Sequence, residues 1–210
     1  GDQCVDFSRH DGINTVLTGA LSSGLLGNAY HHSDLGGYTS LHGVVRTADL
    51  MHRWIDMAAF APVMRSHEGN RPADNLQLDS NPEFLTHFAR MSQVHARLAP
   101  YVRALSDEAV ATGLPLQRPL FLHYDDPAYH DVQDQYLYGA DMLVAPVVEA
   151  DQTGRDVILP EGKWVHLWSG VAYAQGTHAV AAPYGQPPVF TRKDSKFAPL
   201  FASLTEEFGA

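Results

Sequence analysis

The sequence is poor in cysteine, in long hydrophobic runs and in basic residues, and each shortage excludes a class of protein. Among 210 residues Cys4 is the only cysteine, so a disulfide within the chain and a cysteine-rich zinc site are both excluded. One cysteine is typical of a reducing compartment, and we predict a cytoplasmic location. No apolar run approaches the roughly 20 residues of a membrane span, so no membrane partner is predicted.

Basic residues are outnumbered, because 14 Lys and Arg stand against 24 Asp and Glu, and the formal net charge is −10. This charge would repel phosphate and therefore argues against a nucleic-acid partner. The acidic residues are scattered, which indicates a solvated surface rather than an acidic tail. Hydrophobic residues make up 45% of the chain and charged residues 18%, as in an ordinary globular protein.

The first half of the chain alternates between helical spacing and short extended segments, a pattern typical of α/β proteins. Helices with a cap or a stop signal are predicted over residues 13–25, from Thr47 to Pro62, and from Ser80 or Asn81 to Gly113, with a kink or break at Pro100. Short buried strands are predicted between these helices, over residues 29–33 and 62–67.

After Leu114 the segments become short, β-branched and punctuated by turn residues, which indicates antiparallel β structure, in a sandwich. Strands are predicted over residues 119–124, 142–148, 157–159, 164–168 and 189–192. Trp164 and Trp168 are four residues apart on one such strand and share a face. We interpret them as core residues in preference to a sugar-binding platform.

Three polar positions in the first half recur at nearly constant spacing. Asp2, Asp34 and His67 are 32 and 33 residues apart, and one βα unit takes roughly 30 residues. The adjacent Gly36 and Gly37 allow a sharp turn or a close approach to a ligand, because neither has a Cβ atom. In a βα barrel, ligands bind at the C-terminal ends of the strands. We therefore predict that Asp2, the 34–38 loop and His67 face one pocket.

Carboxylates, histidine and hydroxyl groups together suit sugar recognition and acid/base cleavage of a glycoside, in which a carboxylic acid protonates the leaving oxygen. A metal site is the weaker alternative. Side chains of suitable type for metal ligands are present at His31, His32, Asp34 and His67, but their spacing is not that of a metal-binding motif. The sequence contains no GxSxG motif, which argues against catalysis by a serine nucleophile, and Cys4 has no obvious catalytic partner. It also contains neither of the Gly-rich motifs of nucleotide-binding proteins, the P-loop and GxGxxG. No metal and no cofactor are predicted.

Five segments in order along the chain resemble glycoside hydrolase family 31, the α-glucosidase family. They are Gly1-Asp2-Gln3 (its W-x-G-D-N/Q signature), His32-Ser33-Asp34-Leu35-Gly36-Gly37 (H-S-D-I-G-G), Arg65-Ser66-His67 (R-x-H), Arg118-Pro119-Leu120 (R-P-L) and Leu143-Val144-Ala145-Pro146-Val147 (L-V-A-P-V). Within this family the paired histidines before the loop, the tyrosine after it and the His67–Pro72 segment are most similar to the bacterial sulfoquinovosidase branch.

The resemblance implies a role for each candidate site residue. Asp2 matches the general acid/base, His67 the histidine that binds sugar hydroxyls, and Tyr38 the tyrosine of the sulfonate-binding set. Arg65 would order a carboxylate beside the pocket. Asp34 has two roles open to it, holding the loop or contacting the sugar. The implied activity is hydrolysis, with retention of configuration, that releases sulfoquinovose from α-sulfoquinovosides such as sulfoquinovosyl glycerol. These substrates are small molecules, and the reaction needs no cofactor.

The resemblance also implies the fold: residues 1–114 as the C-terminal part of a catalytic (β/α)8 barrel and residues 115–210 as a β-sandwich domain. The nucleophilic carboxylate and the charged sulfonate ligands would then lie outside this chain, and the isolated chain is expected to be inactive. A neutral-sugar α-glucosidase or α-xylosidase and a non-catalytic carbohydrate-binding relative remain alternatives. The sequence leaves homo-oligomerisation open.

Overall fold

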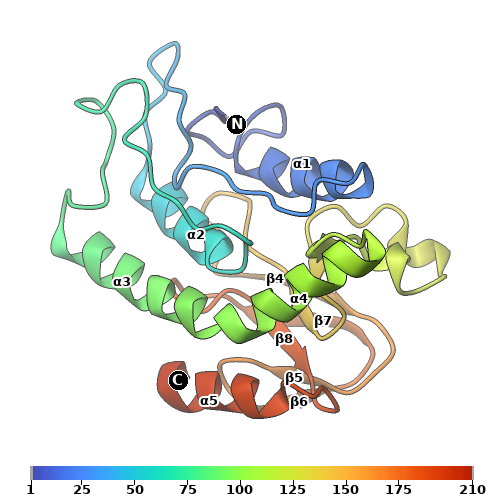
Figure 1. Cartoon of the computed structure of the whole chain (residues 1–210). Helices are drawn as coiled ribbons and strands as arrows, with labels where there is room; N and C mark the ends of the chain where they lie inside the picture. The colour runs from blue at the N-terminus through green and yellow to red at the C-terminus, as the bar shows by residue number, and fades with distance from the viewer. Residues whose placement is uncertain (1, 210) are drawn as a thin grey trace.

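The computed structural model describes residues 2–209 and has a helical first half and a sheet-rich second half (Figure 1). The helices of the first half are α1 (Ile13–Leu25), α2 (Ala48–Ala58), α3 (Pro82–Arg97) and α4 (Ala99–Thr112). Two 3-10 turns and eight strands follow: β1 (Gln117–Arg118), η1 (Leu120–Leu122), η2 (Pro127–Tyr129), β2 (Tyr136–Tyr138), β3 (Met142–Val144), β4 (Gly154–Leu159), β5 (Trp164–His166), β6 (Ala172–Tyr173), β7 (Gly176–Ala181) and β8 (Val189–Arg192). Helix α5 (Ala198–Phe208) closes the described chain.

The helices of the first half begin where local signals predicted, and all but one end there: α2 ends at Ala58, before the predicted stop at Pro62. The Thr47 hydroxyl accepts a hydrogen bond from the Leu50 N–H, and the Asn81 amide oxygen accepts one from the Phe84 N–H, so both are N-caps. Pro100 separates α3 from α4, and the two helices continue nearly end to end across the molecule in Figure 1. Gly113 ends α4 in the left-handed conformation.

Three of the predicted strands are wrong as regular elements. Residues 29–33 and 62–67 are not strands. The next residue, Asp34, forms a single parallel bridge with Arg65, and the Leu35 N–H donates to the Arg65 carbonyl (3.1 Å). A strand needs a ladder along its length, and one bridge does not form a ladder. Within residues 119–124 the regular element is the 3-10 turn η1, not a strand.

The second half is antiparallel throughout its described pairs, as predicted. A six-stranded sheet has the order β1-β2-β3-β8-β5-β6, and a separate two-stranded sheet pairs β4 with β7 over six residues on each strand. Alternate side chains of the large sheet enter two apolar clusters. Tyr136, Met142 and Val189 face the cluster that holds the helices, whereas Leu137 and Phe190 face the cluster that holds β4 and β7. Both faces of the sheet are therefore buried.

The two tryptophans are core residues, as predicted, but the predicted shared face is wrong, because β5 ends at His166 and Trp168 lies beyond it. Trp164 and Trp168 are 0% and 1% exposed and lie in different clusters, and each indole N–H donates to a proline carbonyl. The larger apolar cluster contains residues from both halves of the chain, so the core runs across the position at 114 where the sequence changes character. Among the described helices, none has the length and apolar character needed to span a bilayer.

Helix α5 was not predicted. Its buried residues Phe201, Leu204 and Phe208 have helical spacing, and Pro199 lies in its first turn, so the sequence did contain the signal.

Candidate functional site

Three loop segments that are distant in sequence meet at the predicted site. The N–H groups of Tyr38 and Thr39 both donate to the Gln3 carbonyl, at 2.9 and 2.8 Å. The Thr39 hydroxyl donates to the Asp2 carbonyl at 2.6 Å. The main chain of Asp2 is thus fixed beside Tyr38, while the Asp2 side chain is exposed. The structure therefore brings these two predicted residues together.

Gly36 and Gly37 are required by two independent constraints. Both have positive φ, +77° and +79°, a region that residues with a Cβ atom adopt at a cost. A Cβ atom on Gly37 would lie 2.8 Å from the Cys4 carbonyl oxygen, and one on Gly36 would lie 2.6 Å from the Arg46 side chain. The glycine pair therefore lets the turn pack closely against Cys4 and Arg46. The close approach to a ligand, expected from the sequence, is a separate prediction.

Tyr38 and His67 face each other edge to face, with ring centroids 5.0 Å apart and planes at 82°. The Asn70 N–H donates to the Tyr38 carbonyl at 3.1 Å, which ties the loop after His67 to the glycine turn. The Gly69 N–H donates to His67 Nδ1 at 3.2 Å. A neutral His67 therefore carries its proton on Nε2, where it is free to donate to a ligand.

Asp34 is buried beneath the turn, whereas Arg65 is half exposed. Asp34 Oδ1 lies 3.6 Å from Arg65 Nε, an ion pair that solvent weakens at the arginine end, and this oxygen has no hydrogen bond among the described residues. The Asp34 carbonyl accepts the Gly37 N–H at 2.9 Å. In this arrangement the main chain of Asp34 holds the loop, and the role of its carboxylate toward a sugar stays a prediction.

Arg46 is the residue that sequence reasoning missed. Its guanidinium is buried and donates to three carbonyls, those of Gly36 (2.9 Å), Gly37 (2.6 Å) and Leu76 (2.9 Å). Burial lowers the pKa of Arg46, and the nearby Asp34 carboxylate opposes that shift. Local sequence offers no signal for this role, because the partners are distant and are main-chain groups.

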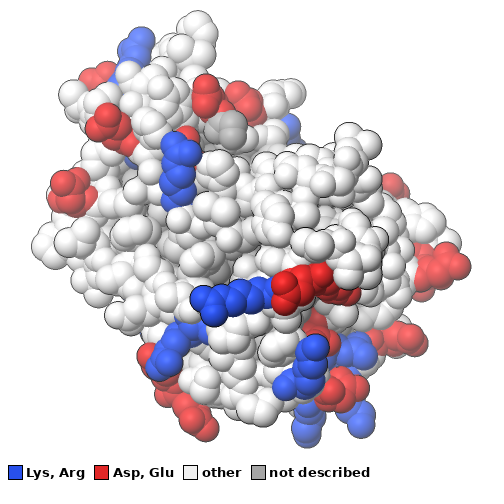
Figure 2. All heavy atoms as spheres, in the orientation of Figure 1, with Lys and Arg blue, Asp and Glu red and all other residues white. Residues whose placement is uncertain are grey.

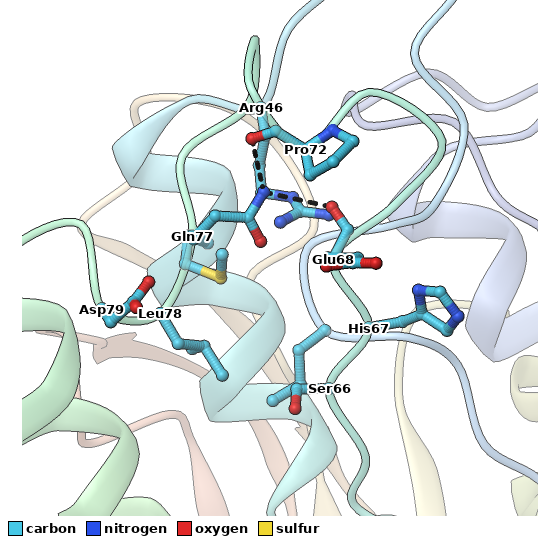
Figure 3. A pocket seen from close by; sticks show the side chains of 10 residues that line it. Arg46, Ser66, His67, Glu68, Pro72, Gln77, Leu78 and Asp79 are labelled. Carbon is cyan, nitrogen blue, oxygen red and sulfur yellow. Dashed lines mark hydrogen bonds between the residues drawn. The ribbon is translucent and has the colours of Figure 1, made fainter.

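A pocket of about 370 Å³ lies beside these residues (Figure 3). Its lining residues are Leu35, Arg46, Met51, Ser66, His67, Glu68, Pro72, Gln77, Leu78 and Asp79. The Gln77 side-chain amide donates to the carbonyls of Glu68 and Pro72, both at 3.1 Å, and so folds the loop back on itself. In Figure 3 the His67 ring points away from Gln77 and Asp79. His67 and Leu35 line this pocket but Asp2, Asp34 and Tyr38 do not, so the prediction that Asp2, the 34–38 loop and His67 face one pocket is met only in part.

The alternative of a metal centre receives no structural support. Across residues 2–209, no three His, Cys, Asp or Glu side chains gather closely enough to hold a metal ion. His31 Nε2 is buried without a hydrogen-bond partner among those residues, and burial lowers the pKa of this imidazole.

Charged side chains of both signs are interspersed on the face shown in Figure 2, with no continuous patch of one sign.

A second cluster of ionisable groups lies away from the site, between α2, α3 and the 182–186 loop. The Asp56 carboxylate accepts the Gly185 N–H (2.9 Å) and lies 2.7 Å from His87 Nε2. His87 Nδ1 in turn faces Nδ1 of His52 at hydrogen-bond distance. Burial raises the pKa of Asp56. Burial, together with the neighbouring His87, lowers the pKa of His52 to about 4.

Two family profiles match the chain in tandem. Residues 4–105 match the Glycosyl hydrolases family 31 TIM-barrel domain, and residues 113–195 match the Glycosyl hydrolase family 31 C-terminal domain. Together they account for most of the chain.

Individual relatives agree with these profiles. The chain is 63% identical over 207 residues to a sulfoquinovosidase of Agrobacterium fabrum (strain C58) and 50% identical over 205 residues to one of Escherichia coli (strain K12). Each alignment covers 97% of this chain, but only 31% and 30% of the two relatives. A solved GH31 family sulfoquinovosidase from E. rectale, in complex with an aza-sugar inhibitor, superposes with a TM-score of 0.98 at 48% identity and covers 100% of this chain and 32% of that one. The chain thus spans about a third of the length of these relatives.

Proposed function

The chain belongs to glycoside hydrolase family 31, and on that premise we propose that it forms the acid/base side of a retaining α-glycoside hydrolase that releases sulfoquinovose from α-sulfoquinovosides. The observation that supports the proposal is the packing of the Tyr38 ring against His67, with the main chain of Asp2 bonded to the neighbouring Thr39, in a chain 63% identical to a sulfoquinovosidase. The nucleophilic carboxylate belongs, in this proposal, to sequence outside these 210 residues.

The proposed mechanism assigns one step to each of these side chains. Asp2 donates a proton to the glycosidic oxygen as the enzyme's nucleophilic carboxylate, which lies outside these 210 residues, attacks the anomeric carbon, and a glycosyl-enzyme forms. Asp2 then accepts a proton from the water that hydrolyses this intermediate. The exposure of Asp2 leaves its carboxylate accessible to a substrate. His67 donates its Nε2 proton to a sugar hydroxyl, since Nδ1 already accepts the Gly69 N–H.

Tyr38 supplies the proposed selectivity. Its main chain is held on both sides, by Gln3 and by Asn70, so the phenol projects from a fixed backbone. A phenolic O–H that donates to an anionic sulfonate makes a charge-assisted hydrogen bond, which a neutral sugar hydroxyl does not replace at equal strength. Arg65, beside the buried Asp34, is proposed to order a carboxylate at the pocket edge.

The wider architecture follows from the same premise. We propose that residues 1–114 complete a (β/α)8 barrel, with the site at the C-terminal ends of its strands, and that residues 115–210 form the accompanying β-sandwich. The apolar cluster shared by the large sheet and the β4–β7 pair supports the sandwich. The proposed substrate is a small-molecule glycoside, and the proposed location is the cytoplasm.

The deciding experiment is an assay of the complete polypeptide on nitrophenyl α-sulfoquinovoside and nitrophenyl α-glucoside, side by side. A strong preference for the sulfonated substrate is expected. Preference for the glucoside would retain the roles of Asp2 and His67 and overturn the sulfonate role of Tyr38. Activity on neither substrate, with binding of the free sugar by calorimetry, would favour the non-catalytic relative.

A further inference from the structure

We propose that Arg46 is a positioning residue, a buried guanidinium that fixes Tyr38 relative to His67 and thereby controls recognition of the anionic group of the substrate. This inference rests on the proposed function and adds to it a buried residue outside the set predicted from the sequence. It acts through the two loops that it joins, the glycine turn and the loop after His67.

The contacts of Arg46 all point to this joining role. Nε and one Nη donate to Gly36 and Gly37 on the turn, and the other Nη donates to Leu76 on the second loop. The main-chain N–H of Arg46 donates to the Asn75 amide oxygen at 2.7 Å, so the residue is itself anchored to the second loop. A planar guanidinium is suited to holding several carbonyls at fixed angles at once, which an ammonium group is not.

The arrangement is costly, which argues against an incidental contact. Arg46 is 2% exposed, and its hydrogen bonds go to neutral carbonyls. Taking a guanidinium out of water is unfavourable unless its donors are satisfied. Asp34 is the acidic group that opposes the effect of burial on the Arg46 pKa.

Close packing transmits the position of Arg46 to the site. A Cβ atom on Gly36 would meet the Arg46 side chain at 2.6 Å, and one on Gly69 would lie 2.9 Å from the Tyr38 carbonyl and 3.4 Å from Arg46 Nη2. These close approaches leave little slack between the two loops. A shift of the guanidinium would therefore change the spacing of the Tyr38 and His67 rings, now 5.0 Å.

Arg53 provides a matched control. It is also buried, at 3% exposed, and also donates to main-chain carbonyls, those of Ala182 (2.8 Å) and Gln152. Those contacts join α2 to the second half of the chain, away from Tyr38. Arg53→Lys should therefore lower the thermal midpoint without changing substrate preference, as a purely structural arginine would.

The test measures kcat and KM of the complete polypeptide on the sulfonated and the neutral nitrophenyl glycosides for Arg46→Lys, Tyr38→Phe and the double variant. We expect Arg46→Lys to reduce kcat/KM on the sulfonated substrate by up to about tenfold, no more than Tyr38→Phe does, mainly through KM, with a smaller loss on the neutral substrate. The losses in Arg46→Lys and Tyr38→Phe should be less than multiplicative, because the first acts through the second.

A preference ratio equal to that of the wild type, or fully multiplicative losses, would overturn the positioning role. If Arg46→Lys does not fold, Asn75→Ala, which removes the anchor of the Arg46 main chain, takes its place with a smaller expected effect in the same direction. Should the wild type prefer the neutral glycoside, the proposed function fails first. In that case Arg46→Lys, His67→Ala and the double variant, assayed on the neutral substrate, test whether Arg46 positions His67. Fully multiplicative losses would reject this positioning role.

Discussion

Residues 28–47 and 61–80 contain the turn and loops of the candidate site but no regular strand, whereas β4 and β7 pair along six residues each. The site loops are held instead by individual hydrogen bonds, some between main-chain groups and others from side chains to carbonyls, such as those of Arg46 and Gln77. The sheets are held by ladders and by two apolar clusters. Single substitutions in the loops should therefore alter function first, and those in the sheets should alter stability first.

The largest expected effect would sharpen this contrast at Asp2. Asp2→Asn in the complete polypeptide removes the proton that the mechanism requires, and kcat should fall by about 10²- to 10⁴-fold. Because the side chain is exposed, the free energy of unfolding should change by less than about 0.5 kcal/mol. Steady-state kinetics and urea unfolding on the same preparation would check both. Unchanged turnover would reject the acid/base role.

The opposite outcome is expected in the sheet. Trp164→Ala removes a fully buried indole that donates to the Pro160 carbonyl and lies under the Arg192 guanidinium. The free energy of unfolding should fall by about 3–5 kcal/mol. Trp164→Phe, the control, should lose less because it fills part of the space. If the folded fraction of either variant showed a changed preference between sulfonated and neutral substrates, the division between stability and function would break down.

The buried His52 predicts a pH dependence of stability. His52 has a pKa of about 4 when folded and an ordinary value of 6.5, so the unfolded chain takes up this proton first as the pH falls. Stability should therefore decline from pH 6.5 toward pH 4, by up to about 3 kcal/mol from His52. Asp56 opposes this, because burial raises its pKa and the folded state binds that proton first.

Urea unfolding between pH 7 and pH 4.5 would measure this slope. His52→Gln should flatten it, because the substituted side chain does not titrate. Identical slopes in the two proteins would mean that His52 is not the titrating group.

The smallest expected effect lies in a single hydroxyl. Tyr38→Phe keeps the ring that packs against His67 and removes only the O–H. Loss of a hydrogen bond to a charged group should reduce kcat/KM on the sulfonated substrate by about tenfold or somewhat more, and on the neutral substrate by less. Parallel kinetics on both substrates would check it, and equal losses would remove the assignment of Tyr38 to the sulfonate.

Local chemistry explains what the sequence predicted well. The caps at Thr47 and Asn81 and the break at Pro100 act within a few residues, so they can be recognised without the fold. The strands expected at residues 29–33 and 62–67 were wrong because strand formation depends on neighbours that sequence pattern does not identify. Helix α5 was missed although its apolar spacing was visible.

The candidate site divides in the same way. Asp2, Tyr38 and His67 were predicted from motif resemblance and regular spacing, and in the structure the Tyr38 ring packs against His67 while Thr39 bonds to the main chain of Asp2. Arg46 was not found, because its partners are carbonyls brought near only by the tertiary path of two loops. A residue that positions others has no chemical signature of its own in the sequence.

The helical pair α3–α4 and the core beneath it have a consequence for protein engineering. The Tyr136 hydroxyl donates to the Phe60 carbonyl at 2.8 Å, and the Tyr101 hydroxyl donates to the Tyr138 carbonyl. These hydrogen bonds join the first half of the chain to the second. A chimera that exchanged residues 115–210 for those of a distant relative would also have to exchange the facing side chains of α4 and of the segment after α2. Recombination at the obvious boundary would otherwise join two surfaces that do not match.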